Sequence, residues 1–159
     1  MKEIPLTRGK VAIVDDDAYE ELSKYRWYCT NKGYATRTAR PRFGKRHEIL
    51  MHRVIMQTPA RMEIDHINGN PLDNRRENLR VCKHSENLKN MKRYSNNTSG
   101  FKGVSWYKRD NKWKTEIMIN GKSTYLGLFD DKRVAAQAYD DAAKEHFGEF
   151  AKLNFEVAL

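Results

Sequence analysis

The stretch EIDHINGNPLDNRRENLRVCKHSENLKN, residues 63–90, decides the local fold of this chain. Asparagine is a poor former of helices and strands, so a run this rich in asparagine predicts a loop whose side chains have another task. The flanking segments MEIDH and LRVCKH predict two strands, and Ser85 is predicted to cap a helix over SENLKNMKR. We therefore expect the order strand, loop, strand, helix.

Four residues of this stretch supply what phosphodiester hydrolysis requires, namely a base, a cation site and a group that orients the base. His66 has an ordinary pKa near neutrality and is predicted to be the base. Asp65 points to the opposite face of the strand, so it is predicted to bind a hard cation through oxygen. Asn87 offers a second, neutral oxygen ligand, and Asn78 is predicted to hydrogen bond the other nitrogen of His66. A surface turn capped by asparagines would explain a bare Asp-His pair, but it does not explain the whole spaced set.

This pattern resembles the HNH nucleases, which fold as a ββα-metal motif, and in particular the homing endonucleases of phages and mobile introns. The resemblance implies that His66 is the general base, that Asp65 and Asn87 bind one Mg²⁺ or Mn²⁺ ion, and that Asn78 orients His66. The motif ends in asparagine where many relatives have histidine, a variant that occurs in the homing branch. No zinc is expected.

Further residues near the motif are candidates for a role at the DNA. Arg53, Arg75 and Arg76 are predicted phosphate contacts, with solvated surface charges as the alternative. His52, in LMHRVIM, matches a histidine that often precedes the motif in these relatives, but its apolar surroundings favour a structural role. The role of His84, next to the predicted helix cap, stays open.

The composition favours a polyanionic partner. The chain has 159 residues with 30 Lys and Arg against 21 Asp and Glu, which gives a net charge of +9, and such an excess most often indicates nucleic acid. No apolar run approaches a membrane span and no signal peptide is evident, so a cytoplasmic protein without a membrane partner is expected. Cys29 and Cys82 form no CxxC pair, so neither a disulfide framework nor a structural zinc site is predicted.

The polar stretch RYSNNTSG, 93–100, predicts a linker between two domains. We place a nuclease domain at 1–94, with its ββα-metal core at about 50–92, and a second domain at 95–159. Upstream, the predicted strands are KVAIV, RWYCT, GYATRT and EILMHRVIM, with a short helix in DDDAYEELSKY. Residues 1–50 are assigned no chemistry beyond a contribution to DNA contact from Arg37, Arg40, Arg42, Lys45 and Arg46.

The C-terminal region predicts a three-stranded sheet and one helix, so the whole chain is predicted to be α+β. The strands are FKGVSWY, KWKTEIMI and STYLGLF, and Asn120-Gly121 gives a strong hairpin signal between the last two. The helix DDKRVAAQAYDDAAKEHF is expected to be capped by Asp130 or Asp131 and closed at Gly148.

Alternation along the strands predicts one core face and one basic face. The core face is predicted to hold Trp113, Thr115, Ile117, Ile119, Val104, Trp106, Leu126 and Leu128. The exposed face is predicted to hold Ser105, Tyr107, Lys112, Lys114 and Tyr125, with Lys108 and Arg109 in the adjoining turn. The helix is expected to pack through Val134, Ala135, Ala138 and Ala142. Residues 101–122 carry six basic and two acidic groups, whereas 130–156 carry four basic and seven acidic, so we expect the sheet to contact DNA and the helix to avoid it.

FKGVSW, KWKTEI, YLGLFD, VAAQAYDDAA and AKLNF, over about residues 97–155, resemble the APETALA2/ethylene-response-factor type of DNA-binding domain. The resemblance implies a sheet that lies in the major groove, backed by an amphipathic helix. Lys102 and Tyr125 match positions that contact DNA in that family. Ser105 and Tyr107 stand where the plant pattern has arginines, so sequence preference does not transfer.

Together these patterns predict a metal-dependent homing-type endonuclease. It would nick or cut double-stranded DNA to leave 3′-hydroxyl and 5′-phosphate ends, would be encoded by a phage or mobile element, and is expected to be a monomer. One alternative is a non-catalytic DNA-binding regulator with a relic nuclease unit, against which the intact Asp65, His66 and Asn87 argue. An RNA-binding protein is the other, and it is disfavoured because the sheet lacks the ribonucleoprotein-type aromatic motif.

Overall fold

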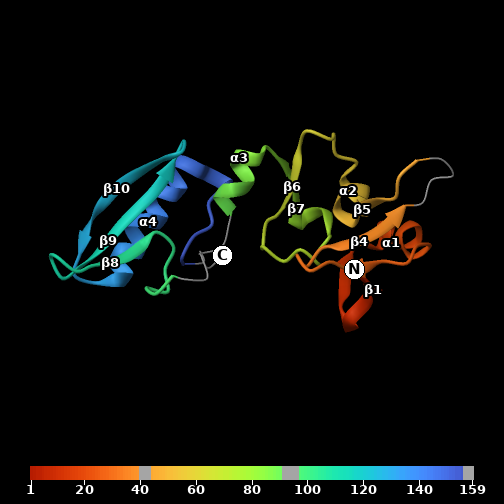
Figure 1. Cartoon of the computed structure of the whole chain (residues 1–159), viewed down its shortest axis with the longest axis horizontal. Helices are drawn as coiled ribbons and strands as arrows, with labels where there is room; N and C mark the ends of the chain where they lie inside the picture. Colours follow the sequence, from red (N-terminus) through yellow and green to blue (C-terminus); the bar gives the residue numbers. More distant parts are fainter. Residues whose placement is uncertain (40–43, 91–96, 156–159) are drawn as a thin grey trace. The chain divides into compact units, whose positions relative to one another are not determined.

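A computed structural model describes residues 1–39, 44–90 and 97–155, and the chain divides into two compact units, Met1–Asn87 and Leu88–Leu159 (Figure 1). Both units combine helices with antiparallel sheets, which confirms the α+β class. The predicted boundary at 94/95, residues 93–96 of the predicted linker, and Arg40 and Arg42 lie outside the described residues. Among the described helices, none is long and apolar enough to cross a membrane.

The first unit consists of small antiparallel sheets and short helices. In chain order these are β1 Lys2–Pro5, β2 Val11–Val14, α1 Asp16–Ser23, β3 Tyr28–Cys29, β4 Ala35–Ala39, β5 His47–Leu50, α2 Met51–Met56, β6 Glu63–His66, β7 Leu79–Cys82 and α3 His84–Asn87. Strand β1 pairs with β2, β4 lies between β3 and β5, and β6 pairs with β7.

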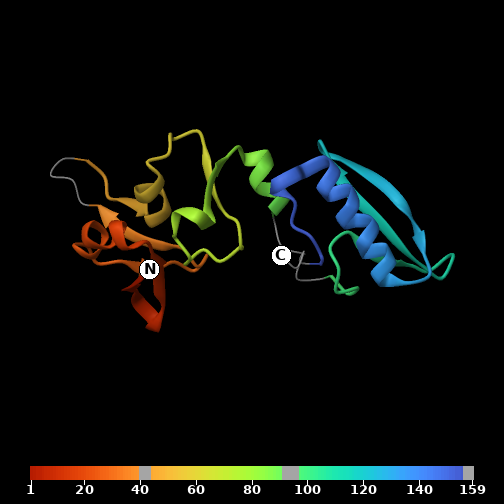
Figure 2. The same cartoon turned by 180° about the vertical axis from the view of Figure 1, so that it is seen from behind.

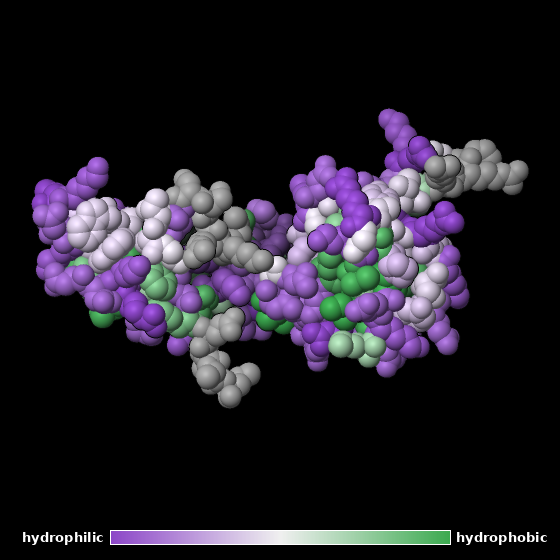
Figure 3. Space-filling view, turned by 90° about the horizontal axis from the view of Figure 1, so that it is seen from below, coloured by the Kyte–Doolittle hydropathy of each residue, from purple (hydrophilic) through white to green (hydrophobic). Residues whose placement is uncertain are grey.

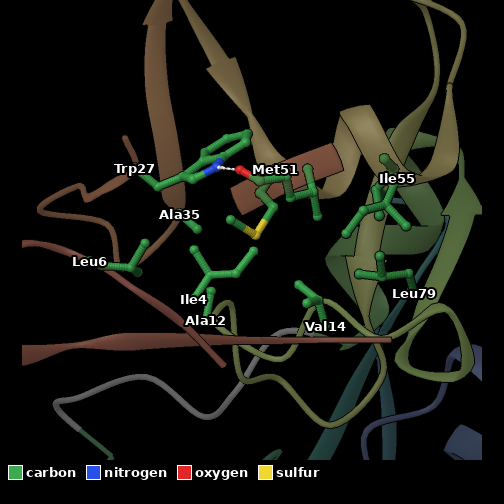
Figure 4. Packing of buried hydrophobic residues seen from close by; sticks show 11 residues of the cluster. Ile4, Leu6, Ala12, Val14, Trp27, Ala35, Met51, Ile55 and Leu79 are labelled. Atoms are coloured by element: carbon green, nitrogen blue, oxygen red, sulfur yellow. Dashed lines mark hydrogen bonds between the residues drawn. The ribbon is translucent and has the colours of Figure 1, made fainter. Parts of the chain in front are cut away.

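One apolar core joins these elements (Figure 4). Figure 4 shows Met51 of α2 and Ile4 of β1 pointing into the same cluster. The buried Trp27 donates its indole N–H to the Leu22 carbonyl at 2.8 Å, which satisfies a donor that would be costly to bury unpaired. Ile64 of β6 and Leu79 of β7 belong to the same cluster. The β6–β7 hairpin is therefore anchored on the core of its unit.

The composition of EILMHRVIM predicted a single strand, but the structure divides the segment into a strand and a helix. Only His47–Leu50 is extended, and Met51–Met56 forms helix α2. Met51 and Ile55 are both buried, and a spacing of four places them on one face of a helix. The spacing of the apolar residues therefore fits a helix better than a strand, and the buried His52 is carried by α2.

The prediction that Ser85 caps the helix after β7 is wrong. Helix α3 begins at His84, so Ser85 lies inside it. Its start is held instead by Glu86, whose carboxylate accepts the backbone N–H of Lys83 at 2.8 Å. This is one half of a capping box, made by a side chain that reaches back to the residue before the helix.

The second unit has the predicted sheet and helix. Its strands are β8 Val104–Tyr107, β9 Lys112–Ile119 and β10 Lys122–Phe129, in the order β10-β9-β8, and helix α4 spans Lys132–Phe147. Figure 2 shows α4 lying along one face of the sheet. Asn120 and Gly121 have φ of 50° and 78°, the left-handed pair that a two-residue hairpin requires. The Asp131 side chain accepts the backbone N–H groups of Arg133 and Val134, which confirms the predicted cap.

A β-bulge in β10 corrects the predicted faces of the sheet. Tyr125 pairs with Glu116 but Gly127 pairs with Thr115, so Leu126 is the extra residue. Leu128 consequently lies opposite Lys114, and directly opposed residues of an antiparallel pair share a face. Leu128 is therefore on the basic face and not, as predicted, on the core face beside Leu126.

The buried stripe of α4 is rotated relative to the predicted one. Val134 is 55% exposed, and the residues buried on this helix are Ala135, Ala136, Tyr139, Asp140, Ala143 and Phe147. Asp140 is not part of an acidic outer face. Its carboxylate accepts the backbone N–H groups of Asn154 and Phe155 at 2.8 and 2.9 Å, so this charge anchors the segment that follows the helix.

Candidate active site and DNA-binding surface

The β6–β7 hairpin presents Asp65 and His66 at the end of its first strand. Asp65 pairs with Arg80 of β7, and His66 pairs with Leu79. Because successive side chains of a strand point to opposite faces, His66 shares the face of the core residue Ile64. Asp65 lies on the other face, as the sequence predicted.

The asparagines between the two strands hold the loop together. The Asn78 carbonyl oxygen accepts the backbone N–H of Asn68 at 3.0 Å, and its Nδ2 donates to the Asp73 carbonyl at 2.8 Å. Asn68 in turn donates from Nδ2 to the Asp73 carboxylate at 2.9 Å, and Asn70 Oδ1 accepts the N–H of Leu72. These side-chain hydrogen bonds stabilise a loop whose backbone groups lack the regular pairing of a strand.

The same loop is fastened to β2. The N–H of Ile13 donates to the Leu72 carbonyl, and the N–H of Asn74 donates to the Ile13 carbonyl, both at 2.8 Å. Arg75 donates to both carboxylate oxygens of Asp73 at 2.8 and 2.7 Å, which lowers the pKa of Asp73. The backbone of Asn74 is thus fixed from both sides, and its side chain is 1% exposed.

His66 lies at the centre of a buried polar cluster. It is 5% exposed, and its Nε2 is 3.4 Å from Asn74 Oδ1. This contact is long for a hydrogen bond, as catalytic contacts often are before substrate binds. Burial lowers the pKa of His66, while the bond to Asn74 and the charges of Asp65 and Asp73 oppose the shift. The ring is therefore mainly neutral near pH 7, which is the form that accepts a proton.

His52 and Tyr34 enclose the other sides of this imidazole. The centroid of the His52 ring lies 5.1 Å from that of His66 in an edge-on arrangement, and the Tyr34 ring lies 6.0 Å away. Burial first, then the neighbouring His66 and Arg53, lowers the pKa of His52 to about 4. Within the described part of the chain, the buried His52 Nδ1 and Asn74 Nδ2 atoms have no hydrogen-bond partner.

The carboxylate of Asp65 is held by Arg80. Nε and Nη2 of the guanidinium both donate to Asp65 Oδ2, at 2.8 and 2.5 Å. The side chains are only 7% and 12% exposed, so this is a largely buried ion pair between the two strands of the hairpin.

Asn87 is tied to the same strand through Glu63. Its Nδ2 donates to Glu63 Oε2 at 2.7 Å, and His84 Nδ1 contacts Glu63 Oε1 at 2.7 Å. These hydrogen bonds lower the pKa of Glu63. Glu63 is two residues before Asp65, so both carboxylates share one face of β6. The bond to Glu63 also fixes which end of the Asn87 amide is oxygen.

The donor chemistry of Asp65 and Asn87 fits a magnesium-like ion. Both offer hard oxygen atoms, and a set with one carboxylate and one amide leaves positions for water and phosphate. Among the described residues no group of three or more His, Cys, Asp or Glu side chains could hold a metal.

The structure places Asn74, and not Asn78, beside the imidazole of His66. Both polar ends of the Asn78 amide are engaged by the loop backbone, and the orienting role predicted for Asn78 stays a prediction. Sequence reasoning missed Asn74, Arg80 and Glu63. The register of the hairpin would have revealed Arg80, but register cannot be counted across so long a loop.

The three arginines predicted to contact phosphate are all engaged within the first unit. Arg53 donates to the Met62 carbonyl at 2.8 Å, and Arg76 donates to the Ile55 carbonyl at 2.9 Å. Arg75 binds Asp73 and also Glu77. Their side chains brace the hairpin, and their contact with phosphate remains a prediction.

The basic face of the second unit carries most of the predicted DNA-contacting residues. Lys114 lies 2.7 Å from Glu116, Lys112 lies 3.2 Å from Asp130, and Arg109 lies 2.8 Å from Asp110. Exposed ion pairs of this kind contribute little free energy, so phosphate oxygens can replace the carboxylates. Tyr125 is 57% exposed and Ser105 is exposed as well. Figure 3, seen from below relative to Figure 1, shows a mostly hydrophilic surface with an apolar area on the first unit.

Lys102 differs from these residues because its ammonium is largely buried. Its Nζ donates to the Lys89 carbonyl at 2.9 Å and lies 6.0 Å from the centroid of the Tyr139 ring. Burial lowers the pKa of Lys102 to about 8. In this structure the ammonium lies between the Lys89 carbonyl and the Tyr139 ring of α4, and its contact with DNA remains a prediction.

Comparison with known proteins assigns each unit a family likeness. The family model for HNH endonucleases matches residues 50–89, and the model for the AP2 domain matches residues 99–149. An uncharacterized HNH endonuclease L560 of Acanthamoeba polyphaga mimivirus is 32% identical over 153 residues, which cover 92% of this chain and 76% of the viral protein.

Two further relatives match parts of the chain. Protein 3.8 of Escherichia phage T7 is 39% identical over 94 residues, which are 59% of this chain and 77% of the phage protein. The APETALA2-like protein 2 of Oryza sativa subsp. indica is 41% identical over 61 residues, 38% of this chain and 14% of the plant protein. No solved structure gives a significant match.

Proposed function

The chain belongs to the HNH endonuclease family, and we propose that it is a metal-dependent, homing-type endonuclease that hydrolyses duplex DNA with His66 as the general base. Its nuclease activity and its AP2 DNA-binding domain follow from these family relationships. The observation that carries the proposal is the buried His66, neutral near pH 7 and in contact with a fixed amide, next to Asp65 on a hairpin that is anchored on the core.

In the proposed reaction His66 takes a proton from the attacking water. Its depressed pKa keeps the imidazole unprotonated at the working pH, which a general base requires. Asp73 and Asp65 lie near enough to influence its charge, so they favour the imidazolium that forms during proton transfer. The bond between phosphorus and the 3′ oxygen breaks, and the leaving oxygen takes a proton from solvent, so the products are a 3′-hydroxyl and a 5′-phosphate.

HNH nucleases generally use a divalent metal ion, and we propose Mg²⁺ or Mn²⁺ here. Asp65 Oδ and Asn87 Oδ1 would hold it, and the bound ion supplies charge neutralisation of the phosphate and the leaving oxygen. Glu63 keeps Asn87 Nδ2 turned to itself, so the oxygen of that amide is the end available for the cation. Arg80 keeps the Asp65 carboxylate in one orientation on its strand.

The second unit is proposed to read double-stranded DNA with its sheet. A three-stranded sheet exposes one row of side chains per strand, and on the basic face these include Lys112, Lys114, Tyr107 and Tyr125. Tyr107 lies under two cations, with Arg109 Cζ at 5.2 Å and Lys114 Nζ at 5.9 Å from its ring centroid. Phosphate contacts would supply affinity, and base edges in the major groove would supply specificity. The viral and phage relatives support an origin in a mobile element.

A cleavage assay on supercoiled plasmid libraries tests the proposal. The purified chain is incubated with Mg²⁺, with Mn²⁺, or with EDTA, and nicked and linear products are measured. We expect products with either ion and none with EDTA. For the variant His66→Ala, the matched control is His47→Ala, because His47 is an exposed residue of β5 in the same unit. Cleavage that persists unchanged in EDTA would refute metal dependence.

A further inference from the structure

A pocket of about 540 Å³ lies in the N-terminal part of the first unit. It is formed between strand β1, helix α1 and residues 25–28. Its volume falls within the range of about 300–1,000 Å³ that is typical of ligand pockets. For this part of the chain the sequence predicted no chemistry beyond a contribution to DNA contact.

The walls of this pocket are rich in aromatic rings. The aromatic residues that line it are Tyr19, Tyr25, Trp27 and Tyr28. Tyr25 is 42% exposed, whereas Trp27 is 4% exposed and belongs to the core cluster (Figure 4). The aromatic surface therefore extends from solvent to the core of the unit. Such a surface is a stacking platform for a flat ring.

Hydrogen bonds hold these walls in place without a ligand. The backbone N–H of Tyr25 and the indole N–H of Trp27 both donate to the Leu22 carbonyl, at 3.2 and 2.8 Å. On the other side of the pocket, the Thr7 hydroxyl accepts the backbone N–H of Cys29 at 3.2 Å. A ligand that enters a pre-formed site loses little affinity to the ordering of its walls.

The charge beside the aromatic rings is positive. Among the described residues that line the pocket, Arg26 is the charged one, and it is exposed. Arg37 of β4 lies over two of the rings, with Cζ at 4.0 Å from the centroid of Tyr25 and 5.7 Å from that of Trp27. Its buried Nε has no hydrogen-bond partner in the described part of the chain. These cations favour a ligand that combines a flat ring with an anionic group.

The acidic residues of α1 do not oppose such a ligand. Tyr19 and Ser23 line the pocket, and their spacing of four places them on one face of the helix. Asp17 and Glu21 are two positions from these residues and so lie on the opposite side. Asp16, three positions before Tyr19, pairs with the N-terminal amino group at 2.9 Å. The surface of the pocket itself is therefore neutral or basic.

We propose, building on the DNA-directed function above, that this pocket binds one unpaired nucleobase of the DNA, with Tyr25 as the stacking ring and Arg26 at the neighbouring phosphate. A nucleotide is a flat ring joined to an anion, which matches the walls and the charge. The base must be unpaired, because the faces of a base inside a duplex are covered by its neighbours. A nucleotide within DNA is favoured over a free one by the net charge of +9, which suits a polyanion.

Stacking is tolerant of base identity, since every base has a flat face. The pocket would therefore hold a strand in place and would not select its sequence. This task is distinct from that of the basic face of the second unit, which is proposed to read duplex DNA.

The test separates the contribution of the base from that of the phosphates. Fluorescence anisotropy in EDTA measures the binding of the full-length protein to a short single-stranded oligothymidylate and to an abasic strand of the same length and charge. Stacking of one base on an aromatic side chain contributes about 5- to 150-fold in affinity. We expect the oligothymidylate to bind more tightly than the abasic strand by a factor in this range.

Variants locate this difference on the protein. Tyr25→Leu should remove most of the preference for the strand with bases, and Tyr19→Leu is the second variant if Tyr25→Leu does not fold in thermal unfolding. Tyr125→Leu, the matched control at an exposed tyrosine of the second unit, should keep the preference. Arg26→Gln should weaken the binding of both strands more than Arg61→Gln does, which removes an exposed charge elsewhere in the first unit.

Three results would overturn the proposal. One is equal affinity of the wild type for the two strands, and another is a preference that Tyr125→Leu removes and Tyr25→Leu keeps. The third is competition by thymidine monophosphate that equals that of the oligothymidylate, which would assign the pocket to a free nucleotide. Because no cleavage occurs in EDTA, failure of the pocket proposal would leave the endonuclease proposal intact, and loss of cleavage activity would not affect the binding measurement.

Discussion

Replacing Arg80 by methionine should make the free protein bind Mn²⁺ more tightly. In the structure the positively charged guanidinium of Arg80 lies against the Asp65 carboxylate, with Nη2 at 2.5 Å from Oδ2 and both side chains nearly buried. A divalent ion on the far side of that carboxylate would lie on the order of 6 Å from the guanidinium. Charges of +2 and +1 at this separation repel by roughly 1.4 kcal/mol in water and about four times that at an effective dielectric constant of 20. Since 1.4 kcal/mol is about tenfold, we expect the dissociation constant to fall at least about tenfold.

The same substitution should destabilise the protein in EDTA. Removing one partner of a buried ion pair leaves the other uncompensated, at a cost of about 3–5 kcal/mol, and Mn²⁺ should recover part of this loss because it binds only the folded site. Calorimetric titration gives the affinity, and thermal unfolding with and without Mn²⁺ gives the stability. Arg80→Lys keeps the charge and should bind Mn²⁺ as the wild type does, and Arg61→Met controls for loss of one exposed positive charge in the same unit. Arg80→Met that binds Mn²⁺ no more tightly than Arg61→Met would refute the reasoning.

Three further predictions address other parts of the chain. The pKa of Glu63 is lowered from 4.5 in the folded state, so its carboxylate contributes stability that is present above pH 4.5 and lost as the pH falls through the folded value. Glu63→Gln should therefore reduce the fall in the free energy of unfolding at acid pH. An unchanged dependence on pH would exclude this contribution. Replacing Lys112 and Lys114 by alanine should weaken DNA binding, and the slope of log binding constant against log salt concentration should fall by up to about 2. Fluorescence anisotropy measures both, and unaffected binding would exclude the sheet face as the DNA-binding surface. Gly103→Ala should destabilise the second unit by about 2–5 kcal/mol, because φ is +77° and the new Cβ would lie 2.1 Å from the Tyr139 ring; equal denaturation midpoints for variant and wild type would contradict this.

Elements set by local chemistry could be predicted from the sequence. The Asn120-Gly121 turn and the Asp131 cap depend on residues within a few positions of one another, and so the strands and helix of the second unit follow from their own patterns. The order strand, loop, strand around Asp65 and His66 is likewise confirmed.

Features that depend on distant residues could not be predicted. The bulge at Leu126 reverses the alternation of β10, and the adjacent Gly127 indicates a bulge without fixing which residue is the extra one. The pairing of Asp65 with Arg80 requires the hairpin register, and the approach of Asn74 to His66 requires the attachment of the loop to Ile13 in β2. In a run of similar asparagines only these tertiary contacts distinguish the residue beside the base from those that brace the loop.

The most direct test of the central role of His66 compares cleavage with binding in His66→Ala. Single-turnover cleavage of a target fragment and equilibrium DNA affinity are measured for the wild type, His66→Ala and His47→Ala. We predict that His66→Ala loses cleavage while its DNA affinity stays close to that of the wild type, since the residue is buried in the first unit and the proposed reading surface is the sheet of the second. Retained cleavage, or a parallel loss of affinity and cleavage, would contradict the assignment of His66 as the general base.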